Sequence, residues 1–261
     1  MKYTERSVKK NKQKRAVKPI FWASILMLLV AVLLILTTFI WFKVERVEIY
    51  GESIYTRENI NLVSKVEVGD SLVLTNAEKI EETLIKELPY IKEAKVTKVF
   101  PSVLRIEITS NSDYGYLVED NKFILFDENL KVLNIVDSYG GDAMPVKLKL
   151  TEKATIGVPL VIDKTEEAVI ETINSYSDVY GLNLTMLNTT DIFDIRLVVD
   201  NRFYVYLGNT TNVNNKLEHL KTVINDIGAM STGTINFNYW SPDNAEAIYV
   251  KEDIRKYIEN Q

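Results

Sequence analysis

The longest apolar stretch of the chain lies near its N-terminus. No residue between Lys18 and Lys43 is charged, so Pro19–Phe42 forms an uninterrupted run of 24 residues. As a helix, this run would be about 36 Å long, enough to cross a hydrocarbon core of roughly 30 Å. Aromatic residues stand at both of its ends, as in the aromatic belts of membrane spans. The pattern predicts one transmembrane helix over residues 19–42.

A cleaved signal peptide is the competing interpretation of this run. Such a peptide has an apolar core of roughly 7–15 residues, followed by a cleavage site of small residues. Here the apolar run is longer, and Lys43-Val44-Glu45-Arg46 follows it. These two features favour an anchor that stays attached to the rest of the chain.

The next part of the chain, residues 43–111, has the pattern strand, helix, helix, strand, strand. Two helices packed on one side of a three-stranded sheet would bury the apolar faces of both layers. Leu104, Ile106 and Ile108 alternate with polar residues and should face the core of the last strand. The expected features are a strand at Val44–Tyr50, a helix capped by Thr56, a capping box at Thr75-Asn76-Ala77-Glu78 that starts a second helix, and strands at Ile91–Phe100 and Val103–Thr109.

Residues 112–250 are richer in short strands, and two amphipathic helices interrupt them. A polar tail follows over residues 251–261, and we expect it to be frayed, with one amphipathic turn of Ile254, Tyr257 and Ile258 as the alternative. The expected strands are Tyr116–Val118, Lys122–Phe126, Leu130–Val136, Val146–Leu150, Asp194–Val199, Arg202–Leu207, Thr234–Tyr239 and Ala245–Val250, and the expected helices are Lys164–Tyr180 and Asn212–Ile227.

Charge is divided unequally along the chain. Residues 1–18 hold eight basic residues and one acidic residue, a net charge of +7, whereas the remainder carries −12. A basic flank stays on the cytoplasmic side of a span, so the folded part should lie outside the cytoplasm. The tail has one aromatic residue and no helical stripe, which favours a topology signal over a nucleic-acid or protein-binding arm.

The sequence offers no catalytic constellation. Without Cys, thiolate chemistry and thiolate metal sites are excluded, and the single His, His219, is expected on the outer face of its helix. The phosphate-binding, dinucleotide-binding and nucleophile-elbow motifs are missing, and acidic pairs such as Glu81/Glu82 are typical of a solvated surface. We therefore expect no enzymatic activity, no cofactor, no metal and no small-molecule substrate.

Six segments of the chain are distinctive in their order and spacing. They are Val44-Glu-Arg-Val-Glu-Ile-Tyr-Gly51, Leu88-Pro-Tyr-Ile-Lys-Glu-Ala-Lys-Val-Thr-Lys-Val-Phe-Pro101, Leu104-Arg-Ile-Glu-Ile108, Phe123-Ile-Leu-Phe-Asp-Glu-Asn-Leu-Lys-Val-Leu133, Leu207-Gly208 with Lys216-Leu217, and Gly233-Thr-Ile-Asn-Phe-Asn-Tyr239. With the order of the parts, these segments resemble the FtsQ/DivIB family of bacterial cell division proteins, and the likeness covers roughly residues 18–250. One departure is Thr109-Ser-Asn-Ser-Asp-Tyr, where the family usually has a Glu-Arg-x-Pro-x-Ala-like stretch.

The resemblance implies an α+β protein with five parts. These are a cytoplasmic tail (1–18), a transmembrane helix (19–42), a POTRA domain of order βααββ (43–111), a strand-rich β domain with two helices (112–250) and a C-terminal tail (251–261). It also implies a single-pass protein of the cell membrane, at the division septum. Its function would be that of a non-enzymatic divisome scaffold that helps regulate septal peptidoglycan synthesis.

The implied partners are FtsL-like and FtsB/DivIC-like single-span proteins, besides membrane lipid, and no nucleic acid. Two other functions stay open, a membrane-anchored cell-wall enzyme and a sensor or transport adaptor that uses its POTRA domain. The sheet edge of the POTRA domain is a second candidate surface, without particular residues assigned to it.

In the family, a partner adds a strand to the C-terminal edge of the β domain. A last strand has one unpaired row of N–H and C=O groups, which is a template for such an addition. Here that strand is expected at Ala245–Val250, with aromatic residues of the kind that anchor interfaces just before it. An alternative is that Tyr239, Ile248 and Val250 only fill the core. The candidate partner-binding residues are Tyr239, Trp240, Ala245, Ala247, Ile248, Tyr249 and Val250.

Overall fold

The computed structural model describes residues 17–258, apart from the side chains of 17–20 and 38–40. Most of the predicted basic tail and residues 259–261 therefore lie outside the described residues. The chain divides into two compact units. The first takes in the chain up to Tyr50, Tyr55–Glu81 and Lys95–Glu107, and the second takes in Gly51–Ile54, Glu82–Ala94 and the chain from Ile108 onward. The predicted domain limits at 43–111 and 112–250 stay predictions.

The first element is helix α1, Val17–Trp41. It covers nearly all of the predicted span, and its described apolar side chains, such as Trp22 and Leu26, are exposed. Within the part of the chain that the structure describes, no helix is both long enough and apolar enough to cross a membrane. The transmembrane helix over residues 19–42 stays a prediction.

A three-stranded sheet with two helices follows, and it has the predicted order βααββ. The sheet order is β1-β3-β2, with β1 parallel to β3, so β3 is the central strand. Leu104, Ile106 and Ile108 are buried on β3, as the alternation predicts. The elements are β1 (Arg46–Tyr50), α2 (Arg57–Ser64), α3 (Ala77–Glu87), β2 (Ile91–Val99) and β3 (Val103–Ser110).

The two helices of this region begin differently from each other. Thr56 caps α2 as predicted, since its hydroxyl accepts a hydrogen bond from the Asn59 N–H at 3.2 Å. The predicted capping box is wrong for α3. Asn76 accepts from the Lys79 N–H at 3.2 Å, and the Thr75 hydroxyl donates to the Ser71 carbonyl at 2.8 Å. The helix begins one residue later than predicted, so an Asn occupies its cap position.

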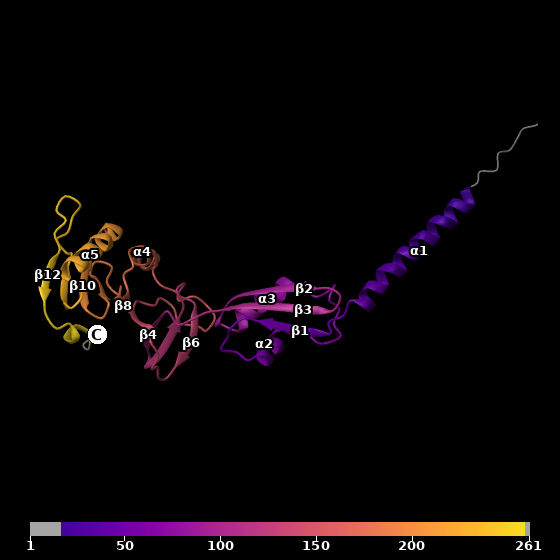
Figure 1. Ribbon diagram of the computed structural model, residues 1–261, viewed down its shortest axis with the longest axis horizontal. Coiled ribbons are helices and arrows are strands. Elements are labelled where there is room, and N and C mark those ends of the chain that lie inside the picture. The colour runs from indigo at the N-terminus through magenta and orange to yellow at the C-terminus, as the bar shows by residue number, and fades with distance from the viewer. Residues whose placement is uncertain (1–16, 259–261) are drawn as a thin grey trace, which may run out of the picture. The chain divides into compact units, whose positions relative to one another are not determined.

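The remaining strands form one nine-stranded sheet of order β12-β11-β10-β9-β8-β7-β4-β5-β6 (Figure 1). The predicted meander is present as the antiparallel neighbours β4, β5 and β6. Strand β8 was not predicted, and helix α6 corresponds to the amphipathic turn that was only the alternative to a frayed tail. The elements are β4 (Gly115–Glu119), β5 (Lys122–Phe126), β6 (Val132–Val136), β7 (Met144–Lys147), α4 (Lys164–Tyr180), β8 (Leu184–Asn188), β9 (Ile195–Val199), β10 (Phe203–Gly208), α5 (Val213–Ile227), β11 (Gly233–Asn236), β12 (Ile248–Lys251) and α6 (Arg255–Ile258).

Two hairpins of this sheet are set by local residue choice. Asp120 and Asn121 between β4 and β5, and Asp200 and Asn201 between β9 and β10, all have positive φ angles between 51° and 59°. A two-residue turn whose backbone twist matches that of the strands requires positive φ at both central positions, which Asn and Asp tolerate best. The sequence therefore determines the register of both hairpins directly.

The C-terminal half of the sheet has two unlike faces. One face packs against α4 and α5 in a large apolar core that includes Leu197, Val205 and Leu217. The other face has a smaller cluster, in which Ile254 packs with Val198 and Tyr204. The expectation of a frayed tail is therefore wrong for residues 251–258, because an apolar stripe on the last turn buries itself on the sheet.

Candidate docking edge

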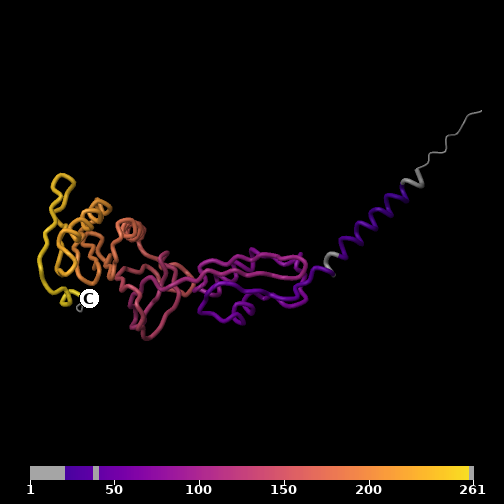
Figure 2. Tube along the Cα trace, viewed as in Figure 1, coloured from indigo at the N-terminus to yellow at the C-terminus, as the bar shows by residue number. Residues whose placement is uncertain are grey.

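Strand β12 is the last strand of the nine-stranded sheet. It pairs antiparallel with β11, with Val250 opposite Thr234 and Ile248 opposite Asn236. Figures 1 and 2 show β12 in yellow at the outer side of the sheet. An outermost strand offers one row of backbone donors and acceptors to another chain.

The direction of the backbone groups on β11 follows from two hydrogen bonds. The Gly233 N–H donates to the Arg202 carbonyl at 3.0 Å, and the Phe237 N–H donates to the Tyr206 carbonyl at 2.8 Å. Both of these acceptors lie on the β10 side. Because successive residues of a strand direct their backbone groups to alternate sides, the residues between them, such as Thr234, point theirs toward β12.

The open row of β12 can then be assigned. Val250 and Ile248 lie opposite the β11 residues that face them, so their backbone groups bond to β11. Tyr249 and Lys251 direct their N–H and C=O groups to the other side, away from β11. These two residues supply the backbone groups that a further strand would use.

Side chains of β12 alternate in the same way. Ile248 and Val250 are 52% and 49% exposed, so they do not fill the core. Tyr249 instead packs on the apolar core, with its ring centroid 6.3 Å from that of Phe203. Its hydroxyl donates to the Thr232 carbonyl at 3.1 Å. Tyr249 thus anchors the strand, and its neighbours present an apolar surface.

The other predicted site residues lie before β12. Tyr239 is 78% exposed, whereas Trp240 is half-buried against the core. Ala245 and Ala247 precede the strand, which begins at Ile248 rather than at Ala245. The reason is that β11 ends at Asn236, the residue opposite Ile248, so the earlier residues have no strand beside them.

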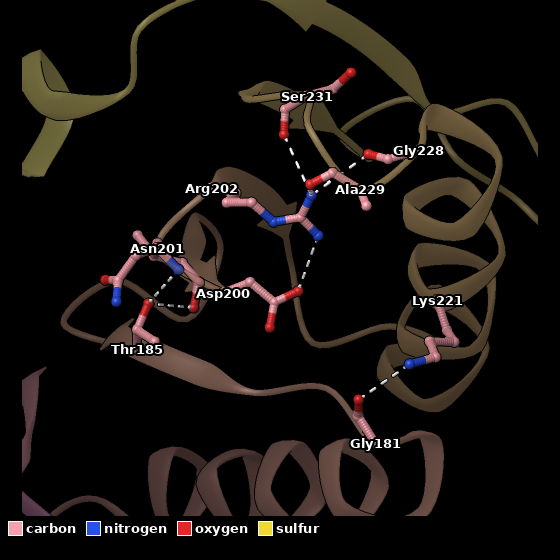
Figure 3. A network of polar contacts seen from close by, with 10 residues as sticks. Gly181, Thr185, Asp200, Asn201, Arg202, Lys221, Gly228, Ala229 and Ser231 are labelled. Atoms are coloured by element: carbon pink, nitrogen blue, oxygen red, sulfur yellow. Dashed lines mark hydrogen bonds and ion pairs between the residues drawn. The ribbon is translucent and has the colours of Figure 1, made fainter.

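One arginine, which sequence reasoning missed, holds the loop that leads into β11 (Figure 3). The Arg202 guanidinium donates to the carbonyl oxygens of Gly228, Ala229 and Ser231, just after α5. It also pairs with the Asp200 carboxylate at 3.2 Å. Carbonyl groups that follow a helix end lack helical partners, and a cation satisfies them well. Arg202 thereby fixes the start of the strand on which β12 depends.

Gly233 allows β11 and β12 to lie close together. A Cβ atom at this position would clash with the Val250 carbonyl oxygen and with the ring of Tyr249. Only glycine avoids both contacts. The pairing of the edge strand therefore depends on a residue without a side chain.

The segment after β12 braces the edge from the second face of the sheet. The Glu252 carboxylate accepts a hydrogen bond from the Thr234 hydroxyl at 2.9 Å and pairs with the Lys256 ammonium group at 2.6 Å. The hydrogen bond from Lys256 and then that from Thr234 lower the pKa of Glu252. The Tyr257 ring stacks on Tyr204 with a centroid distance of 4.9 Å. The signal for this brace was the spacing of the apolar residues from 254 to 258.

A cavity of about 630 Å³ lies beside the β11–β12 connection, with Trp240 and Lys216 among its lining residues. The buried Lys216 ammonium group donates to the carbonyl oxygens of Leu207 and Asn209, both at 3.0 Å. Burial lowers the pKa of Lys216. The Lys216 ammonium group thus holds the loop after β10 through these two hydrogen bonds.

Reactive groups do not gather at this edge. His219 is half-buried with its ring 6.0 Å from that of Phe237, and so it does not lie on the outer face of its helix as predicted. Over residues 17–258, no three His, Asp or Glu side chains are placed so that they could hold a metal ion. The arrangement at β12 suits binding through backbone groups and apolar side chains.

Comparison with known proteins gives matches of two kinds. The family model "POTRA domain, FtsQ-type" matches residues 42–109. A cell division protein DivIB of Clostridium botulinum is 24% identical over 228 residues, which cover 82% of this chain and 84% of the relative. A cell division protein FtsQ of Streptomyces venezuelae is 30% identical over 87 residues, 33% of this chain and 32% of the relative. DivIB of Bacillus anthracis is 28% identical over 167 residues, 62% and 59% of the two chains.

The fold and the matches together define a class, an α+β protein in which a POTRA domain precedes a strand-rich sheet. Within that class, the resemblance to the FtsQ/DivIB family of cell division proteins is confirmed.

Proposed function

We propose that this protein is a divisome scaffold that acts in septation by binding other division proteins. The relatives are named as cell division proteins, and the likeness to DivIB extends over most of both chains. The scaffold binds FtsL-like and FtsB/DivIC-like single-span partners and thereby helps regulate septal peptidoglycan synthesis. It has no catalytic role of its own.

The observation that carries this proposal is the open edge of β12. A partner segment adds to the sheet by bonding to the backbone of Tyr249 and Lys251, and it packs its apolar side chains beside Ile248 and Val250. Tyr239 and Trp240 lie at the start of the same β11–β12 connection and extend the contact. Ala245 and Ala247 flank the strand and are peripheral to the docking edge.

The proposed location is the cell membrane at the division septum. Residues 19–42 span the bilayer once, the basic tail stays in the cytoplasm, and the folded chain from residue 43 onward lies outside. Support comes from the uncharged run of 24 residues and from the helical conformation of Val17–Trp41. The partners are single-span proteins, and so the span brings this chain into the same bilayer.

The test replaces one outward backbone donor without touching the pairing to β11. Lys251→Pro removes the outward N–H at a position whose side chain is exposed, and proline is tolerated on edge strands. Loss of one such hydrogen bond costs about 1 kcal/mol, or roughly a fivefold weakening, and the proline ring adds steric interference. We expect co-purification of the two partners with the full-length protein in detergent to fall at least that far.

Lys251→Ala is the matched control, since it removes the same side chain and keeps the N–H. It should retain the partners, and both variants should unfold at the same urea concentration as the parent. Equal partner recovery with the proline variant would show that β12 is not the docking strand. A fluorescent fusion that fails to gather at midcell would contradict the division role itself.

A further inference from the structure

Exposed apolar side chains lie at one end of the βααββ region that the three-stranded sheet and helices α2 and α3 form. The elements β1 and β3 start at this end, and the chain returns to it twice, in the loop before α3 and in the turn between β2 and β3. Leu74 is 71% exposed and Phe100 56% exposed. Val73 is also exposed. We call these three residues, Val73, Leu74 and Phe100, the apolar rim.

The rim is tied to the residues that directly follow the apolar helix. The Leu72 N–H donates to the Phe42 carbonyl at 2.9 Å, and Lys43 and Ser71 form an isolated β-bridge. The Phe42 and Phe100 rings meet edge to face with their centroids 5.3 Å apart. The Phe100 ring and the loop that carries Val73 and Leu74 therefore contact the two residues that directly follow helix α1.

The loop that carries Leu74 is shaped to hold its side chain outward. Leu72 is fully buried and fixes the loop in the core. The Thr75 N–H donates to the Ser71 carbonyl at 3.0 Å, which closes the turn around Leu74. The Lys98 ammonium group donates to the Val73 carbonyl at 2.9 Å and joins this loop to β2. Exposed apolar side chains that lie together, rather than singly, are typical of a surface that contacts a partner.

Charge around the rim indicates what kind of surface this is. Lys43 and Lys98 are offset by Glu45, Glu67 and Asp70 in the same segments, so the rim has no basic excess. A surface that recognises anionic headgroups needs a cluster of basic residues. This rim instead has apolar groups with aromatic neighbours, the composition found where proteins meet the membrane–water interface.

We propose that the apolar rim inserts into the interface of the outer leaflet and docks the βααββ region on the lipid surface. The inference rests on the proposed span, since that span is what brings Phe42 to the bilayer. Leu74 and Phe100 enter the region between headgroups and acyl chains, with the exposed Trp41 at the same depth. Insertion fixes the height of β1 above the membrane.

The chain has no Cys, so single labels can be placed without background. A nitroxide spin label is attached to the full-length protein at Leu74→Cys or Phe100→Cys, in vesicles of phosphatidylcholine alone. Accessibility to oxygen, which concentrates in lipid, is compared with accessibility to a water-soluble nickel complex. We expect the oxygen-to-nickel ratio to be several-fold higher at these two sites than at the control Arg57→Cys. Arg57 is the first residue of α2 and is not part of the apolar rim.

Adding anionic phosphatidylglycerol to the vesicles should leave the ratios unchanged, because the rim binds through apolar groups. Ratios at positions 74 and 100 equal to that at position 57 would overturn the proposal. Protection that arises only when the division partners are added would assign the rim to a protein contact instead. Release of the protein from vesicles by alkaline carbonate would show that the span itself is wrong, which is a separate failure.

Discussion

The two faces of the nine-stranded sheet near its C-terminal edge are covered in different ways. On one face, α4 and α5 bury a continuous apolar core that includes Ile173, Leu217 and Phe203. On the other face, the cover is a segment of seven residues, 252–258, of which only Ile254 is fully buried. Polar contacts of Glu252 and ring stacking of Tyr257 complete this second cover. The first face stabilises the fold, and the second braces one edge of it.

This difference has a consequence for cooperativity. A side chain shared by several elements can be lost only when the whole unit unfolds, whereas a terminal segment can open by itself. Substitutions on the two faces should therefore differ in the size of their effect and in how far the effect spreads.

The largest effect is expected for Leu217→Ala. Leu217 on α5 is fully buried, and its truncation leaves a cavity between the helix and the sheet. The free energy of unfolding should fall by about 2–5 kcal/mol, measured by urea denaturation. Leu62→Ala, at an exposed leucine of α2, is the control and should change it by less than about 0.5 kcal/mol. A small loss at Leu217 would mean that α5 is not part of the core.

A smaller effect is expected for Ile254→Ala on the second face. Ile254 is as fully buried as a core residue, but its segment can open locally. The loss should stay below about 2 kcal/mol, the lower end of the range for such truncations. Amide hydrogen exchange should accelerate in residues 252–258 and stay slow in β9 and β10. Equal acceleration across the sheet would show that both faces belong to one cooperative unit.

Glu166 on α4 should give a still smaller effect, with a clear pH dependence. Burial raises the pKa of this carboxyl, although it accepts hydrogen bonds from the Thr189 hydroxyl at 2.8 Å and the Lys149 N–H at 3.2 Å. Folding then favours the protonated form, so stability falls as the pH rises from the unfolded pKa through the folded one. Glu166→Gln should be slightly more stable than the parent at pH 7 and equal to it below pH 4, in urea denaturation at both pH values. Glu167→Gln, at the exposed neighbouring residue, is the control. The difference in stability between this variant and the parent should be the same at both pH values.

The opposite pH dependence is expected for Glu252, with the smallest amplitude because this group is only partly buried. Its pKa is lowered, chiefly by the hydrogen bond from Lys256, so its contribution exists above the unfolded pKa. That contribution disappears as the pH falls through the folded pKa. Glu252→Gln should speed hydrogen exchange in the brace at pH 7 but not at pH 3. An effect of equal size at both pH values would show that the charge of the Glu252 carboxylate does not stabilise the brace.

The local elements were largely predictable, because periodicity and turn residues specify them. The hairpins at Asp120-Asn121 and Asp200-Asn201 and the cap at Thr56 depend on residues close in sequence. Strand β8 was missed, although it lies inside the sheet. Its partner β7 is distant in the sequence, and its other partner, β9, follows only after a long turn. In addition, Leu184–Asn188 has too few alternating apolar and polar residues to be distinctive.

The edge position of β12 was predictable, but its bounds and supporting contacts were not. Being last in the chain made β12 a candidate, yet its first residue is set by where β11 ends, at Asn236. Arg202 was missed because its acceptors are carbonyl groups, which no residue pattern reveals. The brace at Glu252 was missed because its partner Thr234 lies on another strand.

The alternation along β12 separates the groups that face outward in the plane of the sheet from those that project above it. Tyr249 places its side chain in the core and its backbone N–H at the open edge of the sheet. Alanine scanning leaves every amide in place, so it would register Tyr249 as a stability residue and overlook the pairing that is proposed for it. In the proposed docking, the amides of Tyr249 and Lys251 bond to the partner whatever side chains stand there, whereas Ile248 and Val250 must stay apolar to pack against it. Sequence change at Lys251 is then tolerated while the complex persists, provided that Gly233 lets β11 and β12 lie close together.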